Sequence, residues 1–227
     1  ERTTIAMKFI YQLEVSGQCN LRCEYCPHPR SRRKKGLMTE QVIERSLEIV
    51  QKLGQEYLCL HNFGEPLLHP MIIDIIKTAK KTVKTLVMST NGILLTRNIA
   101  EKIRDAGLSE LYISVHDKQA AEKAIIACEG LDILREIRDN FDHDWAGTAA
   151  RHSEHFSPRE KREDSYKGCC SFIESEWAIV LWDGRVNSCC MDMDGHGIIG
   201  SIFDEDILQK KPRYHSLCHE CNFLQPS

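Results

Sequence analysis

The sequence predicts an α/β protein that combines a parallel sheet with a small C-terminal unit of β-hairpin and helix. Strand-like and amphipathic helical stretches alternate through the first 130 residues, as in chains that build parallel sheets. The 11 cysteines gather in two places, residues 19–26 and 169–221, with only two between them. An Asp-Gly pair at 183–184 separates two apolar stretches and predicts a hairpin turn. These observations indicate one scaffold that carries two separate cysteine sites.

The expected elements of the first part follow one another in a regular order. Strand composition marks residues 9–16, 57–64, 84–92 and 110–116. Helical spacing of apolar residues marks 38–53, 70–82, 96–107 and 118–130. Thr39 can cap the first helix, Pro70 suits the first position of the second, and Gly107 closes the third. Ligands of such parallel sheets bind at the carboxyl ends of the strands, where the cysteine loop at 19–26 also lies.

The pattern weakens over residues 131–168, which are polar, charged and poor in branched apolar residues. We interpret this stretch as a linker, a loop that covers a site, or both. Beyond it, residues 176–192 predict the hairpin, and residues 203–211 predict a short helix before the final Cys-x2-Cys.

Composition favours a protein of the cytoplasm. The chain has 227 residues, 42% of them hydrophobic and 28% charged, with a net charge of −3, so nothing indicates a nucleic-acid or membrane partner. No apolar run approaches the ~20 residues that span a bilayer, and no signal peptide opens the chain. The cysteine count is odd, and cytosolic thiols stay reduced, so metal binding is favoured over disulfides.

The first cysteine group lies in the stretch QCNLRCEYC, which places Cys19, Cys23 and Cys26 within eight residues. Three thiolates can ligate three irons of a four-iron cluster and leave the fourth iron open, which is a catalytic arrangement. The alternatives are a Cys3His zinc knuckle that uses His28 and a chance grouping of free thiols.

This spacing, with Tyr25 just before the last cysteine and a strand before the loop, resembles the radical S-adenosylmethionine (SAM) superfamily. The stretch NFGEP at 62–66 resembles the family's Gly-Gly-Glu-type element, with Phe63 in place of the first glycine. STNG at 89–92 and ISVH at 113–116 match further elements that end the third and fourth strands. The resemblance covers roughly residues 9 to 130.

The resemblance implies a partial (β/α) TIM-like barrel over residues 1–150. It also implies a [4Fe–4S] cluster whose open iron binds SAM through its amino and carboxylate groups. One electron then cleaves SAM, and the resulting 5′-deoxyadenosyl radical abstracts a substrate hydrogen. The family pattern assigns the cofactor-binding role to Tyr25, Phe63, Gly64, Glu65, Asn91, Ser114 and His116. Glu65 is expected to accept from the SAM ammonium group, whereas His116 can also be read as an ordinary polar residue at a strand end.

The second cysteine group resembles the half of the SPASM motif that is called a Twitch domain. Its expected ligands to an auxiliary [4Fe–4S] cluster are Cys170, Cys189, Cys218 and Cys221, within a linker and auxiliary domain at 151–227. Cys169 and Cys170 both fit the permitted gap, and Cys190 is interpreted as spare. The alternative is a structural zinc ribbon. Four thiolates leave no open iron, which favours electron transfer or a structural role.

The chain resembles, in particular, the short Twitch-bearing radical SAM enzymes of the 2-deoxy-scyllo-inosamine dehydrogenase type. That resemblance implies oxidation of a small polar metabolite, with the auxiliary cluster as electron acceptor and flavodoxin or ferredoxin as donor. The alternatives are a maturase that crosslinks or epimerises a ribosomally made peptide, and a non-enzymatic metal or electron-transfer protein. No spacing selects a catalytic acid or base from Trp145, Arg151, His152 and His155. The basic run at 30–35 is interpreted as a solvated loop face, with an acidic substrate or the electron donor as alternative partners.

Overall fold

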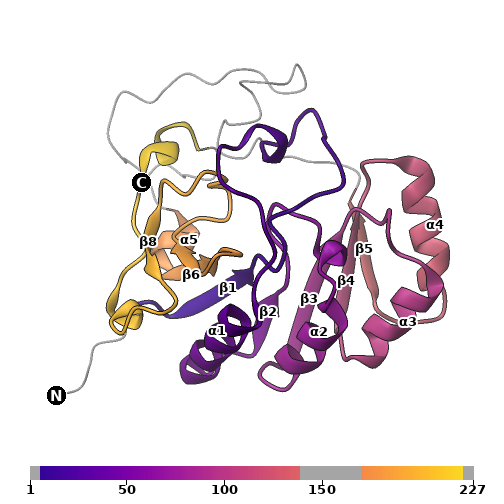
Figure 1. The fold of residues 1–227 in the computed structure, drawn as a ribbon, viewed down its shortest axis with the longest axis horizontal. Helices are drawn as coiled ribbons and strands as arrows, with labels where there is room; N and C mark the ends of the chain where they lie inside the picture. The colour runs from indigo at the N-terminus through magenta and orange to yellow at the C-terminus, as the bar shows by residue number, and fades with distance from the viewer. Residues whose placement is uncertain (1–5, 139–169, 222–227) are drawn as a thin grey trace.

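The computed structural model describes residues 6–138 and 170–221, whose helices and strands are shown in Figure 1. The strands are β1 (Phe9–Leu13), β2 (Tyr57–Cys59), β3 (Thr85–Thr90), β4 (Glu110–Ser114), β5 (Leu134–Arg138), β6 (Trp177–Val180), β7 (Arg185–Asn187) and β8 (Ile198–Ser201). The helices are α1 (Glu40–Leu53), α2 (Ile72–Lys80), α3 (Arg97–Asp105), α4 (Lys118–Cys128) and α5 (Ser171–Glu174). Short 3-10 helices cover His28–Arg30, Pro66–Leu68, Ile207–Gln209 and Ser216–Glu220.

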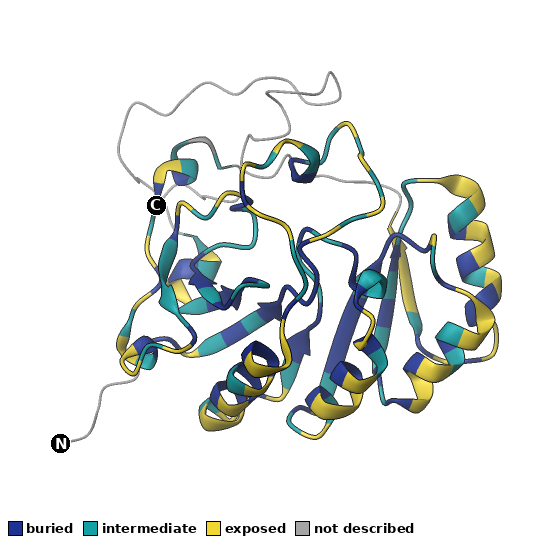
Figure 2. Ribbon diagram, viewed as in Figure 1, coloured by how far each residue is buried: buried dark blue, intermediate teal, exposed yellow. Residues whose placement is uncertain are grey.

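All eight described strands form one sheet in the order β5-β4-β3-β2-β1-β6-β7-β8. Strands β1 to β5 run parallel, and α1 to α4 connect them along one side of the sheet (Figure 1). Helix faces toward the sheet are buried and the opposite faces are exposed, so the core lies between sheet and helices (Figure 2). The predicted α/β class with a partial barrel is confirmed.

The helix boundaries follow local capping chemistry. Thr39 Oγ1 accepts a hydrogen bond from the Val42 N–H at 3.4 Å, and α1 begins at the next residue as predicted. The expectation for Pro70 is wrong, because α2 begins only at Ile72 and Pro70 lies outside it. Pro70 lies in a turn before the helix, which is closed by the hydrogen bond that the Ile72 N–H donates to the His69 carbonyl at 3.1 Å.

The C-terminal strands continue the sheet of the first part. β6 pairs in parallel with β1, and the β6–β7 hairpin turns at Asp183-Gly184, where Gly184 has a φ of 83° that suits glycine. The predicted hairpin is confirmed, and β8 adds a third strand that the sequence did not reveal. The proposed boundary between domains near residue 150 falls outside the described residues and stays a prediction.

The helix expected over 203–211 is replaced by the single 3-10 turn Ile207–Gln209. The Asp204 carboxylate accepts from the Ser201 N–H at 2.9 Å and from Lys210 at 2.7 Å, so it stabilises a turn instead of a longer helix. Among the described helices, none is long and apolar enough to cross a bilayer.

Strand β5 lies within residues 131–168, for which the sequence predicts a linker or a loop. It pairs with β4 at the edge of the sheet, and most of its side chains are exposed. An edge strand needs no continuous apolar pattern, which explains why its polar sequence LREIR gave no strand signal. The four residues considered as a catalytic acid or base, Trp145, Arg151, His152 and His155, lie outside the described residues.

Candidate functional site

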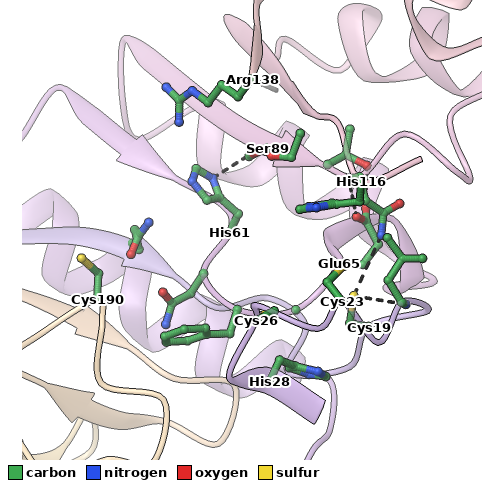
Figure 3. A pocket seen from close by; sticks show the side chains of 18 of the residues that line it. Cys19, Cys23, Cys26, His28, His61, Glu65, Ser89, His116, Arg138 and Cys190 are labelled. Carbon is green, nitrogen blue, oxygen red and sulfur yellow. Dashed lines mark hydrogen bonds between the residues drawn. The ribbon is translucent and has the colours of Figure 1, made fainter. Parts of the chain in front are cut away.

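A cavity of about 740 Å³ opens at the carboxyl ends of the parallel strands. All ten residues that the sequence assigned to the first cluster and SAM line it. They are Cys19, Cys23, Tyr25, Cys26, Phe63, Gly64, Glu65, Asn91, Ser114 and His116. Figure 3 labels the three cysteines, Glu65 and His116 among them. The structure thus brings these residues to one place, while their individual roles stay predictions.

The three thiols of the first group lie close enough to influence one another. The pKa of Cys26 is raised to about 12, by burial first and then by the neighbouring Cys23 and Cys19 thiols. Burial also raises the pKa of Cys19, whose sulfur accepts from the Leu21 N–H at 3.5 Å. Without metal these half-buried thiols are therefore neutral, and an iron cluster would take them as thiolates.

Gly64 lets the loop after β2 touch the cysteine loop. A Cβ at this position would lie 1.9 Å from the Ser16 carbonyl oxygen and 2.7 Å from that of Gln18. The adjacent Glu65 N–H donates to the Gln18 carbonyl at 2.7 Å. Phe63 is buried beside them and lines the cavity. Only glycine permits this close approach of two backbones.

The Glu65 carboxylate, 2% exposed, joins the loops after β2 and β3. It accepts from the Leu67 N–H at 3.0 Å, the Thr90 hydroxyl at 2.7 Å and the Asn91 N–H at 2.8 Å. Burial raises its pKa, while these hydrogen bonds act in the opposite direction. A carboxylate offers about four acceptor positions, so one remains for the ammonium group of SAM that we expect there.

Asn91 connects the loop after β3 with the cysteine loop. Its amide nitrogen donates to the Asn20 side-chain oxygen at 2.7 Å and approaches the Cys19 sulfur at 3.9 Å. Its amide oxygen accepts from the Ile93 N–H at 3.1 Å. In this position Asn91 fixes the cysteine loop in addition to any contact with the cofactor.

The remaining SAM candidates lie across the cavity, at the end of β4. Tyr25 shares a hydrogen bond with Nδ1 of His116, and burial lowers the pKa of His116 to about 4. The Ser114 hydroxyl lies 3.2 Å from that of Ser89. His116 is thus a neutral residue in contact with the tyrosine of the cysteine motif, and its role toward SAM stays a prediction.

His28, which the zinc-knuckle alternative requires, is engaged by the backbone at one ring nitrogen. Its Nε2 hydrogen-bonds to the Gly17 carbonyl at 3.0 Å. Within the described residues, no three His, Cys, Asp or Glu side chains converge on a position for a single metal ion. The three thiols of the first group line one shared cavity.

The basic run contains one residue with a structural role. Arg33 is buried and pairs in bidentate fashion with the buried Glu14, with both N–O distances at 2.6 Å. Its Nε also donates to the Met193 carbonyl at 2.9 Å. The Trp182 ring N–H donates to the Lys34 carbonyl at 3.1 Å. The loop after the first cysteine group is therefore fastened to the C-terminal hairpin, and the reading as a fully solvated face is wrong at Arg33.

The second cysteine group also comes together. The pKa of Cys218 is raised to about 12, by burial first and then by the nearby thiols of Cys189, Cys221 and Cys170. The four reach this place from the start of α5, the end of β7 and the last 3-10 helix. Their assignment as cluster ligands stays a prediction, and Cys169 lies outside the described residues.

Several cavity residues were not predicted. Cys190 lines the same cavity as the first group, on the side that faces the C-terminal strands (Figure 3). His61 follows β2, and Glu136 and Arg138 come from the missed strand β5. His61 lies within the stretch 57–64 that was expected to be a strand, whereas β2 ends at Cys59 and leaves His61 at the strand end. β5 left no signal in the sequence.

Comparison with known protein families agrees with this geometry. The family model described as the radical SAM superfamily matches residues 13–126, which is half of the chain. The chain belongs to the radical SAM superfamily. The family implies a [4Fe–4S] cluster and SAM, and the described cavity offers the three thiols and the strand-end residues that such cofactors need.

Curated relatives match over the same region. The chain is 30% identical over 120 residues to the tungsten-containing aldehyde ferredoxin oxidoreductase cofactor-modifying protein of Pyrococcus furiosus. It is 33% identical over 113 residues to the GTP 3′,8-cyclase of Aquifex aeolicus. These matches cover 52% and 47% of this chain and only 33% and 35% of the relatives, so the shared part is the radical SAM core.

Solved structures extend the likeness over most of the chain. The structure of BtrN in complex with AdoMet and 2-DOIA matches with a TM-score of 0.69 at 19% identity, covering 90% of this chain and 83% of that one. The histidine-tagged anSMEcpe with bound AdoMet matches with a TM-score of 0.58 at 15% identity, covering 95% and 82%. These similarities confirm the fold.

Proposed function

We propose that this radical SAM enzyme oxidises a small polar metabolite and uses the auxiliary cluster as electron acceptor. The observation that carries the proposal is the shared cavity, which reaches from the three cysteines of the first loop to Cys190. Cys190 directly follows Cys189, which is one of the expected auxiliary ligands. A substrate in this cavity would lie between the group that starts the reaction and the group that completes it.

The unassigned part of the cavity suits a small polar molecule. Gln12 Oε1 and Asn62 Nδ2 are buried there without a hydrogen-bond partner among the described residues. One is an acceptor and the other a donor, and buried polar atoms of this kind are normally satisfied. The charges of Arg138 and Glu136 pair with each other at 3.1 Å. This combination favours a neutral compound with hydroxyl groups.

His61 places a hydrogen-bond donor, its ring N–H, in the cavity. The Ser89 N–H donates to His61 Nδ1 at 3.2 Å, and burial together with Arg138 lowers the pKa of His61 to about 4. The neutral ring therefore carries its proton on Nε2 and cannot accept another there. We propose that His61 holds a substrate oxygen and is not the base of the reaction.

The proposed reaction balances as a two-electron oxidation. When bound on Cys19, Cys23 and Cys26, a [4Fe–4S] cluster would supply the electron that splits SAM into methionine and the 5′-deoxyadenosyl radical. That radical would take the hydrogen atom from a carbinol carbon of the substrate and leave as 5′-deoxyadenosine. The substrate would then lose its hydroxyl proton to solvent and one electron to the auxiliary cluster, which would yield a carbonyl. We propose a cytoplasmic flavodoxin or ferredoxin as the donor to the first cluster.

The likeness in fold to BtrN, whose structure was solved in complex with AdoMet and 2-DOIA, supports a small-molecule substrate.

The experiment that tests this proposal measures deuterium transfer. Sugars and cyclitols deuterated at the carbinol carbons are mixed with reconstituted, reduced enzyme and SAM, with GTP and a synthetic peptide as comparison substrates. Deuterium in 5′-deoxyadenosine together with a carbonyl product from a sugar or cyclitol is the expected result. Transfer only from the peptide would favour a maturase, and no release of 5′-deoxyadenosine at all would favour a non-enzymatic electron carrier.

A further inference from the structure

His215 lies beside the second cysteine group, directly before the 3-10 helix Ser216–Glu220. His215 is only 6% exposed, and neither nitrogen of its ring has a hydrogen-bond partner among the described residues. Nitrogens of a buried imidazole are normally paired with protein or a bound group. The unsatisfied ring therefore indicates a partner that is bound in the functional protein.

The surroundings of the ring show what that partner is. The ring packs against Gly197, where a Cβ would lie 2.6 Å from its Cδ2 and 3.0 Å from its Nε2. Cys189 belongs to the same group, and the ring lies near enough to its sulfur to act on the charge there. Gly197 thus leaves the space that the imidazole occupies beside the second cysteine group.

The backbone of the same residue faces a second sulfur. The His215 N–H donates to the Cys218 sulfur at 3.4 Å. Cys189 follows strand β7, whereas Cys218 belongs to the last 3-10 helix, so His215 lies where two separate segments of the chain bring their sulfurs together. The sulfur of Cys189 also accepts from the Met191 N–H at 3.3 Å.

We propose that His215 is a positioning residue of the auxiliary cluster, whose ring N–H donates to the Cys189 sulfur while its backbone N–H donates to the Cys218 sulfur. This inference rests on the proposed function, because it requires the auxiliary cluster. A cluster-bound sulfur is a thiolate and a far better acceptor than a neutral thiol, so it satisfies the buried ring. Hydrogen bonds to cluster sulfurs stabilise the more negative reduced state and raise the reduction potential. His215 thereby makes the auxiliary cluster a better electron acceptor.

The test uses the full chain with Cys19, Cys23 and Cys26 replaced by alanine, so that only the auxiliary cluster remains. After anaerobic reconstitution, iron and zinc are quantified and the midpoint potential is measured by EPR-monitored titration. His215→Phe removes the ring donor, and His215→Gln keeps one. His196→Phe is the matched control, because His196 also hydrogen-bonds to a side chain of this region, Asp192, but its own side chain is 44% exposed.

About four irons per chain are expected in all of these proteins. His215→Phe should shift the oxidised-to-reduced ratio at a fixed potential about tenfold, equivalent to about 59 mV more negative for one electron. His215→Gln should shift it less, and His196→Phe should leave it unchanged. Loss of iron in His215→Phe but not in His215→Gln would also support a positioning hydrogen bond.

Three results would overturn the inference in different ways. If the triple-alanine protein binds no iron, the auxiliary cluster of the proposed function is wrong and the inference fails with it. If the cluster is present and His215→Phe has the same potential as the triple-alanine protein that keeps His215, only the role of His215 is wrong. Equal loss of iron in His215→Phe and His215→Gln would point to a direct ligand or a packing role, and would also overturn it.

Discussion

The two cysteine groups of this chain are built in different ways. Cys19, Cys23 and Cys26 follow β1 on a single loop within eight residues, and neighbouring loops only fasten that loop in place. The second group draws its thiols from the start of α5, the end of β7 and the last 3-10 helix. The cysteines of the first site thus lie close together in the sequence, whereas those of the second site come together only when the sheet folds.

Because of this difference, mutations near the two sites should have different primary effects. Changes in the first loop should remove chemistry and leave the fold, because the loop lies at one end of an intact sheet. Changes in the contacts between the first loop and the hairpin should reduce stability first. The Glu14–Arg33 pair and Trp182 form that connection.

The largest expected effect is the loss of SAM cleavage in Cys23→Ala. One of three thiolates is then missing, and the cluster that supplies the electron cannot be held with an open iron. Release of 5′-deoxyadenosine from the reduced, reconstituted protein should fall to the background without enzyme. Cys128→Ala is the control, because Cys128 is buried in α4 away from the cavity and its change should leave the release intact. Equal activity in both variants would contradict the assignment of the first loop.

The next effect is on stability and concerns the connection between the two sites. Arg33→Met leaves Glu14 buried without its partner, which should lower the free energy of unfolding by about 3–5 kcal/mol. Urea unfolding of the metal-free protein measures this. Arg32→Met, at an exposed neighbouring position, is the control and should change little. The double variant Glu14→Gln with Arg33→Met should recover much of the loss, and failure to recover would show that packing, not charge, holds the connection.

A smaller loss is expected at the contact between the loops after β1 and β2. Gly64→Ala places a Cβ 1.9 Å from the Ser16 carbonyl, and the strain should cost about 1–3 kcal/mol and weaken SAM cleavage. Gly54→Ala serves for comparison, because its Cβ would meet open space and only its left-handed φ of 64° is unfavourable. That variant should lose about 1 kcal/mol and keep SAM cleavage. If both variants cleave SAM equally well, the close approach of the loops does not matter for the cofactor.

The smallest expected effect is a pH dependence of stability that is due to His61. Its pKa is about 4 in the folded protein and about 6.5 when unfolded. The unfolded chain therefore binds more protons between these values, and stability falls as the pH decreases from about 6.5 toward 4. The slope from this residue is at most about 1.4 kcal/mol per pH unit. His61→Gln should flatten the curve of unfolding free energy against pH by that amount, and an unchanged slope would mean that His61 titrates normally.

The sequence predicted the first site well because its signals are local. The spacing of the three cysteines, Gly64 and Glu65 after the second strand, and Asn91 after the third each follow a strand end, and parallel strands bring their ends together. Helix α1 could be predicted equally well, from Thr39 and from the spacing of its apolar residues. The start of α2 could not be predicted, because a turn between His69 and Ile72 places it after Pro70.

What escaped prediction depends on tertiary pairing. β5 has an exposed, polar sequence and is a strand only because β4 offers it an edge. Arg33 looks like part of a solvated basic run until Glu14 is found buried beneath it. The positions of Cys190 at the cavity and of His215 beside the second cysteine group likewise follow from how β6 and β7 continue the sheet of β1.

We propose that one chain holds an open three-cysteine site and a closed four-cysteine site. The decisive measurement is the iron content and 5′-deoxyadenosine release of three reconstituted proteins: the unsubstituted chain, the Cys19/Cys23/Cys26 alanine variant, and the Cys189/Cys218/Cys221 alanine variant. We expect about eight, four and four irons per chain, with release wherever the first three cysteines remain. Four or fewer irons with bound zinc in the unsubstituted chain, or release without those cysteines, would contradict it.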